Sequence, residues 1–215
     1  MNFTSLTAIA VSIFVFSTVG IAQAPEKAKT GDRLGVETPR YDTRGREIYV
    51  ASTTKGSIAL LITANERVLN WDNGQTQKYD PNYTWVEQTS GGVTTPTEAR
   101  SQLKFLHLDG DPKAKKEVAN TYKSNAAQCG TVVATYVSEG KDVSYALTVR
   151  GKQTELKAVE VLLDGKWSAA CGTGKQSVKV TYSPELDLLL TYEYLNFLPS
   201  GILNSGIGWR VTSLD

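Results

Sequence analysis

The chain has 215 residues, with 23 basic and 22 acidic side chains that give a formal net charge of +1. This balance argues against a nucleic-acid-binding protein, which normally carries a basic excess concentrated on one face. The length fits one domain or two small ones.

An uncharged leader opens the chain, and residues 6–16 are dominated by Ala, Ile, Val and Phe. Such a run followed by small residues is typical of a secretory signal peptide, and it is shorter than the roughly 20 apolar residues of a membrane span. A small-x-small triplet ending at Ala22 predicts cleavage before Gln23, whereas a second triplet ending at Ala24 would leave Pro25 after the cut. An uncleaved N-terminal anchor is the alternative. Because no cysteine lies near the cut, a lipid anchor is not predicted.

We therefore expect residues 1–22 to be a signal peptide and the mature protein to be periplasmic or secreted, with no stable membrane span after cleavage. Residues 23–44 are polar and contain two prolines, which predicts an extended N-terminal segment. Residues 45–215 are expected to form a β domain. A loop containing Pro96 suggests a potential division into two halves near residues 91–102.

From residue 45 onward, β-branched and aromatic runs alternate with turn signals about every 8–12 residues. Asn73-Gly74 is the strongest hairpin signal, because both residue types tolerate a positive φ. Residues 113–122 fit either a strand or a short helix, and the surrounding pattern favours a strand. The predicted strands are 48–52, 57–63, 68–71, 75–79, 83–89, 131–138, 143–150, 155–163, 177–182, 186–197 and 207–214. Further turns are predicted at 55–56, 139–140, 151–152 and 164–165, and a loop over 93–101.

This spacing predicts a mostly β fold built as an antiparallel meander. The runs are too short and too often broken by turns for βαβ units, so a parallel sheet is not expected. A curved sheet, a sandwich and an incomplete barrel all fit the pattern.

Cys129 and Cys171 are the only cysteines, and both are followed by Gly-Thr. In an oxidising compartment such a pair is expected to form a disulfide at turns or strand ends, which would stabilise the fold by about 3–4 kcal/mol in the chain-entropy model. Two free thiols are the alternative. The lack of a Cys-x-x-Cys spacing argues against a redox-active role.

Three motifs stand in the C-terminal part: Lys157-Ala158-Val159-Glu160-Val161, Gly165-Lys166-Trp167 and Tyr182-Ser183-Pro184-Glu185-Leu186. They resemble a recurring pattern in exported bacterial β-rich proteins of unknown function. Gly31-Asp32-Arg33 is similar to a Gly-Asp-x-Trp opening of that group, although Leu34 stands where Trp is expected. The resemblance covers roughly residues 103–197. It implies an envelope location and a β fold, and it implies no activity.

Few side chains in the sequence are candidates for metal binding or catalysis. His107, the only histidine, lies close to Asp109 and Asp111, and these three are weak candidates for a metal site. A strand end with polar turn residues is the interpretation we favour, so neither a metal nor another cofactor is predicted. Glu185 and Asp187 are weak candidates for paired catalytic acids, because residues two apart on a strand share a face at about 6–7 Å. A structural role is favoured, since Glu185 follows a proline in a predicted corner.

Aromatic side chains gather in the last predicted strands, at Tyr182, Tyr192, Tyr194 and Trp209. Packing within the sheet core is the favoured interpretation. The alternative is an aromatic-lined concave surface that binds a lipid tail, a peptide or a glycan.

The sequence contains no recognisable catalytic or metal-binding signature. We therefore predict a non-enzymatic, exported envelope protein that binds an apolar or polymeric ligand, or another envelope protein. A hydrolase of an envelope polymer and a purely structural β scaffold are the alternatives.

Overall fold

The computed structural model describes residues 25–48, 54–96, 111–124 and 127–215. The predicted mostly β fold is confirmed, and within these ranges no helix is long and apolar enough to cross a membrane. The N-terminal strands are β1 (Arg33–Thr38), β2 (Arg40–Tyr41), β3 (Glu47–Ile48), β4 (Thr54–Ile62), β5 (Arg67–Trp71), β6 (Thr76–Tyr79), β7 (Trp85–Ser90) and β8 (Val93–Pro96). The later elements are β9 (Lys116–Lys123), the 3-10 helix η2 (Ala127–Cys129), β10 (Thr131–Val149), β11 (Lys152–Ala169), β12 (Gly172–Ser183), β13 (Leu188–Phe197) and β14 (Leu203–Leu214).

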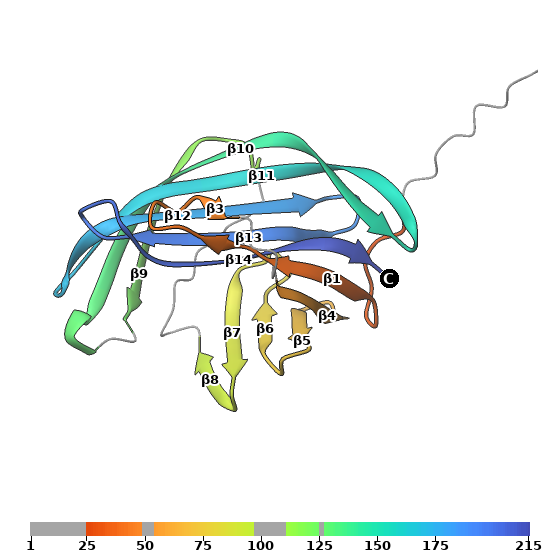
Figure 1. Ribbon diagram of the computed structural model, residues 1–215, viewed down its shortest axis with the longest axis horizontal. Coiled ribbons are helices and arrows are strands. Elements are labelled where there is room, and N and C mark those ends of the chain that lie inside the picture. The colour runs from red at the N-terminus through yellow and green to blue at the C-terminus, as the bar shows by residue number, and fades with distance from the viewer. Residues whose placement is uncertain (1–24, 49–53, 97–110, 125–126) are drawn as a thin grey trace, which may run out of the picture.

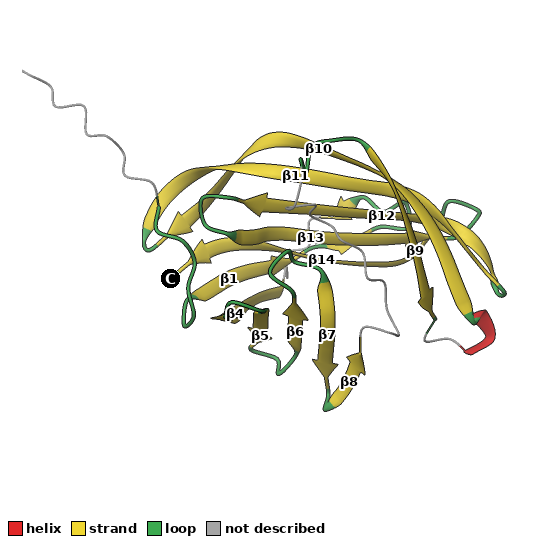
Figure 2. Cartoon of the chain, turned by 180° about the vertical axis from the view of Figure 1, so that it is seen from behind, coloured by secondary structure: helices red, strands yellow, loops and turns green. Residues whose placement is uncertain are grey.

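Twelve strands form one sheet in the order β8-β7-β6-β5-β4-β1-β14-β13-β12-β11-β10-β9, and β2 pairs with β3 in a separate ribbon. The neighbours along this order pair antiparallel, as predicted. The sheet is strongly curved and is not closed into a barrel. In both views β5–β8 lie below the layer of long strands and run across them (Figures 1 and 2).

The N-terminal segment takes part in this sheet. Residues 33–38 form β1, which lies between β4 and β14 and so joins the two meanders. The predicted signal peptide and residues 97–102 of the potential division at 91–102 lie outside the described residues. The strands on either side of that division belong to the same sheet.

The β10–β11 hairpin changes the face that it buries. In the first half of β10 the even-numbered residues Ala134 and Tyr136 are buried, whereas in the second half the odd-numbered Leu147 and Val149 are. Pairing with β11 continues through this switch without a register shift. Because side chains alternate strictly between faces, the hairpin must curl so that opposite faces meet the core at its two ends. The far end of β10 also forms a short parallel pairing with β14, in which Val149 is opposite Leu214.

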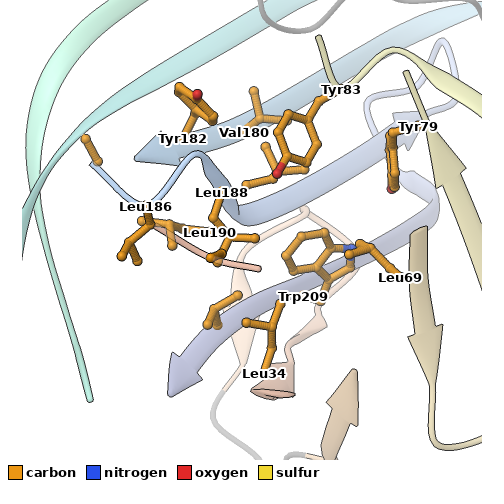
Figure 3. Packing of buried hydrophobic residues seen from close by; sticks show 14 of the residues in the cluster. Leu34, Leu69, Tyr79, Tyr83, Val180, Tyr182, Leu186, Leu188, Leu190 and Trp209 are labelled. Carbon is orange, nitrogen blue, oxygen red and sulfur yellow. The ribbon is translucent and has the colours of Figure 1, made fainter. Parts of the chain in front are cut away.

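Two neighbouring strands are covered on both faces near their shared corner. Residues 180–183 of β12 and 188–190 of β13 are buried at consecutive positions, whereas a half-buried strand would alternate. Tyr83, from the turn between β6 and β7, packs here with its ring centroid 5.9 Å from that of Tyr182. Tyr83, Tyr182 and Trp209 belong to one hydrophobic core (Figure 3).

One predicted turn is confirmed by its backbone, and a second forms one residue earlier than predicted. Gly74, in the Asn73-Gly74 hairpin, has a φ of 80°. The turn predicted at 151–152 is formed by Arg150 and Gly151, with φ values of 46° and 78°, because Lys152 already begins β11. Both are the positive values that a two-residue hairpin turn requires.

The predicted turns at 55–56, 139–140 and 164–165 are wrong, because these residues lie inside β4, β10 and β11. Glycine has a different role there. A Cβ on Gly140 would lie 2.5 Å from the carbonyl oxygen of Pro112, and one on Gly165 would lie 2.3 Å from that of Thr135. These glycines allow close backbone approach within the strands.

The predicted loop over 93–101 is also partly wrong, because residues 93–96 form β8. This strand is at the edge of the sheet, where a proline such as Pro96 is tolerated.

Candidate functional site: a charged groove across β9–β12

The candidate catalytic carboxylates do not form a pair on a strand. Residues 184–187 make the turn between β12 and β13, so Glu185 and Asp187 do not share the strand face that their spacing suggested. The Asp187 carboxylate accepts hydrogen bonds from Arg67 at 3.1 Å and from the Tyr182 hydroxyl at 2.7 Å. Both of its oxygens are therefore used in holding the corner.

The residues around Asp187 hold the corner in place. The Tyr83 hydroxyl donates to the Asp187 carbonyl oxygen at 2.9 Å, and both residues have positive φ, 58° and 52°. Burial raises the pKa of Tyr83 and of Tyr182, so both hydroxyls keep the protons that they donate. Arg67 is only 12% exposed. This cluster fixes the N-terminal meander to the β12–β13 corner.

The four aromatic candidates do not line one surface. Tyr192 stacks on Trp209 with centroids 6.5 Å apart, and Trp71 meets Trp209 edge to face at 6.1 Å. Trp209 is 5% exposed and Tyr182 is 8% exposed, so both are core residues. Tyr182 belongs instead to the cluster around Asp187.

Tyr194 lies in a separate buried polar network centred on Gln176. The Gln176 amide nitrogen donates to the Tyr194 hydroxyl at 2.9 Å and to the Tyr122 hydroxyl at 3.2 Å. Its amide oxygen accepts a hydrogen bond from Tyr136 at 2.5 Å. These contacts satisfy a side chain that is only 3% exposed.

Of the weak metal candidates, His107 and Asp109 lie outside the described residues. Asp111 is exposed, and its carboxylate accepts a hydrogen bond from the Lys113 backbone at 2.9 Å. In the described part of the chain, no three His, Cys, Asp or Glu side chains form a metal-sized group.

The disulfide is confirmed. Cys129 and Cys171 are bonded with an S–S distance of 2.06 Å, at the end of η2 and in the β11–β12 turn.

A groove of about 710 Å³ crosses β9, β10, β11 and β12. Cross-strand register arranges its exposed residues in two rows. The acidic row consists of Glu117, Val137 and Asp164, which are opposite one another on β9, β10 and β11. The basic row consists of Ala119, Thr135, Lys166 and Lys175, which are opposite one another on β9 to β12. Residues directly opposite in a sheet share a face, and the two rows are two residues apart along the strands, so both rows project from the same side.

The charges of the groove are not paired with each other. Across the described residues, the side chains of Glu117, Asp164, Lys166 and Lys175 make no hydrogen bond and no ion pair. Elsewhere on these strands charges do pair, since Lys141 of β10 pairs with Glu160 of β11, and Lys179 of β12 pairs with Glu193 of β13. The groove therefore presents separated positive and negative charges to a ligand.

Sequence reasoning missed this groove because its residues come from four strands. Only the pairing register places Glu117 in line with Asp164, and Lys166 in line with Lys175. The one local signal is Asp164-Gly165-Lys166, whose first two residues have the pattern of a turn.

No protein-family model matches the chain, and no curated protein matches it. Among solved structures, it is similar to the hypothetical lipoprotein YmcC from Escherichia coli, with a TM-score of 0.52, 5% identity and coverage of 86% of this chain and 88% of that one. A candidate lipoprotein from Parabacteroides distasonis has a TM-score of 0.40 at 10% identity, over 89% of this chain and 98% of its own. A candidate exported protein from Bacteroides fragilis with a YmcC-like fold has a TM-score of 0.32 at 8% identity, over the same shares. The likeness to YmcC shows a shared fold.

Proposed function

We propose that this protein is exported to the bacterial envelope and acts there as a non-enzymatic binding protein. The observation that carries the proposal is the groove across β9–β12, where exposed charges of both signs line a hollow without pairing with each other. An open, mixed-charge surface of this kind suits a polar polymer better than an apolar ligand, because the large aromatic candidates are used in the core.

A hydrolase is the less favoured function. The Asp187 carboxylate is held by Arg67 and Tyr182, and Glu185 lies in the corner turn rather than opposite it across a cleft. An acid that acts on a glycosidic bond needs a second carboxyl group facing it across the substrate.

Three observations support the envelope location. The leader has the pattern of a secretory signal peptide, and the two cysteines form a disulfide, which is typical of exported proteins. The fold is shared with YmcC, which is described as a hypothetical lipoprotein. We also propose kinship with the exported β-rich proteins whose motifs the chain resembles. Two of these motifs lie on β11, and one of them contributes Lys166 to the groove.

Site-specific photo-crosslinking in cells that produce the full chain tests this function. A benzophenone amino acid in place of Thr135, in the floor of the groove, should give a covalent adduct in the envelope fraction. The same probe in place of Lys157, an exposed position on β11 outside the groove, should give much less. Mass spectrometry of the mature N-terminus should show a start at Gln23. Retention of the leader in the cytoplasm, or equal adducts at both positions, would contradict the proposal.

A further inference from the structure

We propose that the groove binds an extended peptide segment in which a basic and an acidic side chain are two residues apart. This inference rests on the proposed binding function and specifies its ligand. It follows from the register of the charges, their spacing and the shape of the groove floor.

The register places unlike charges in separate rows. Glu117 and Asp164 flank Val137 on the two neighbouring strands, so a cation above Val137 would lie between two carboxylates. Lys166 lies beside Thr135, and Lys175 of β12 is the next residue in that row, farther from the β9 edge. An anion above Thr135 would therefore approach two ammonium groups.

The spacing of the rows matches that of an extended chain. Val137 and Thr135 are two residues apart on β10, as are Asp164 and Lys166 on β11, and two residues on a strand span about 6.5–7 Å. An extended peptide that runs along β10 has the same repeat, with side chains i and i+2 on one face. Its basic side chain can then lie over the acidic row while its acidic side chain lies over the basic row.

The floor is low and open. Val137 is 40% exposed, and its neighbours Ala119 and Thr135 have short side chains. A backbone can approach such a floor, whereas the small apolar area offers little to an acyl chain. A uniformly acidic polymer would meet Glu117 and Asp164, and a uniformly basic one would meet Lys166 and Lys175, so like-charge repulsion disfavours both.

Fluorescence anisotropy with two labelled nonapeptides of equal composition tests the inference on the exported protein. One peptide, Thr-Lys-Thr-Glu-Thr-Lys-Thr-Glu-Thr, alternates its charges on one face. The other, Thr-Thr-Lys-Glu-Thr-Thr-Lys-Glu-Thr, places each Lys and Glu on opposite faces. We expect the alternating peptide to bind at least tenfold more tightly and to lose affinity as salt is raised.

Charge variants give the matched controls. Lys166→Gln with Lys175→Gln should abolish the preference between the peptides, and Lys157→Gln on the same strand should leave it unchanged. Glu117→Lys with Asp164→Lys should transfer the preference to a peptide with Glu at every second position. Thermal unfolding of each variant checks that it folds.

Each contrary outcome is informative. Equal affinity for the two isomers would overturn the inference. So would the binding of neither peptide, or Lys166-dependent binding of phosphatidylethanolamine vesicles in place of peptides. If the Thr135 adduct still forms in cells, the binding function survives these outcomes; if that adduct is absent, the proposed function fails as well.

Discussion

At the scale of single residues, the corner at Asp187 shows how a candidate catalytic acid becomes a structural one. The Asp187 carboxylate balances the charge of Arg67, which is mostly removed from solvent. The Asp187 carbonyl oxygen accepts a hydrogen bond from the Tyr83 hydroxyl. A partly buried cation that loses its carboxylate keeps its desolvation penalty without the compensating attraction. The corner is therefore expected to matter for stability rather than for chemistry.

The substitution Asp187→Asn tests this role. Asparagine tolerates the positive φ, so the turn is kept while the charge is lost. We expect the free energy of unfolding in urea to fall by about 1.5–3 kcal/mol, the range for hydrogen bonds to charged groups. Glu87→Gln is the control, because it removes the more exposed Lys78–Glu87 pair, and it should cost less than about 1 kcal/mol. Equal losses would contradict the structural role.

The ribbon β2–β3 depends on another residue-scale contact. The Tyr41 hydroxyl donates to the Glu193 carboxylate at 3.0 Å, and a Cβ on Gly208 would lie 2.5 Å from that hydroxyl oxygen. Gly208→Ala should therefore destabilise the protein by about 1–3 kcal/mol through overpacking. In a Tyr41→Phe background the clashing oxygen is gone, and the same substitution should cost less.

A double-mutant cycle in urea measures this coupling. Gly56→Ala serves as the control, because its Cβ would meet its nearest atom at 3.5 Å, an ordinary contact. Additive effects of Gly208→Ala and Tyr41→Phe would show that the hydroxyl is not the limiting contact.

At the scale of elements, the β10–β11 hairpin decides the form of the molecule. One half of it carries the groove residues on its exposed face, and the other half curls over the core until β10 meets β14. The disulfide lies at the groove end of this hairpin, where it ties η2 to the β11–β12 turn. The covalent bond thus supports the half of the hairpin that carries the groove residues.

Replacing both Cys129 and Cys171 by serine tests this contribution. The bond closes a loop with a sequence separation of 42, and the chain-entropy model predicts a loss of about 3–4 kcal/mol in the free energy of unfolding. Dithiothreitol should lower the stability of the wild-type protein by a similar amount and leave the variant unchanged. A variant as stable as the wild type would show that folding does not depend on this bond.

At the scale of the whole molecule, tyrosine hydroxyls connect the layers and remain protonated. Burial is the leading cause that raises the pKa of each of these residues, to about 12 for Tyr145. Burial likewise raises the pKa of five further tyrosines, Tyr41, Tyr79, Tyr83, Tyr136 and Tyr182. In the unfolded chain a tyrosine ionises near pH 10.

Stability is therefore expected to fall as the pH rises above about 10. In that range the unfolded state has lost phenolic protons that the folded state still binds, so ionisation favours unfolding. Each fully buried tyrosine contributes at most about 1.4 kcal/mol per pH unit. Urea unfolding between neutral and alkaline pH, followed together with tyrosinate absorbance, checks this. A stability that stays constant while the tyrosines titrate near pH 10 in the folded protein would contradict it.

The sequence alone determined the fold class and several local features. Strand periodicity, the Asn73-Gly74 and Gly151 turns, and the cysteine pair are carried by local pattern and residue chemistry, and the structure confirms them. The same signals failed at Gly140 and Gly165, because a glycine inside a strand and a glycine in a turn look alike when the neighbouring strand is unknown.

Only the tertiary structure decided the candidate site. The rows containing Glu117 with Asp164, and Lys166 with Lys175, exist because four successive strands pair in one particular register. A shift of one residue would turn every one of these side chains to the other face. That register is set jointly by the turns that join these strands and by the face that each strand buries, so no single strand of the sequence contains it.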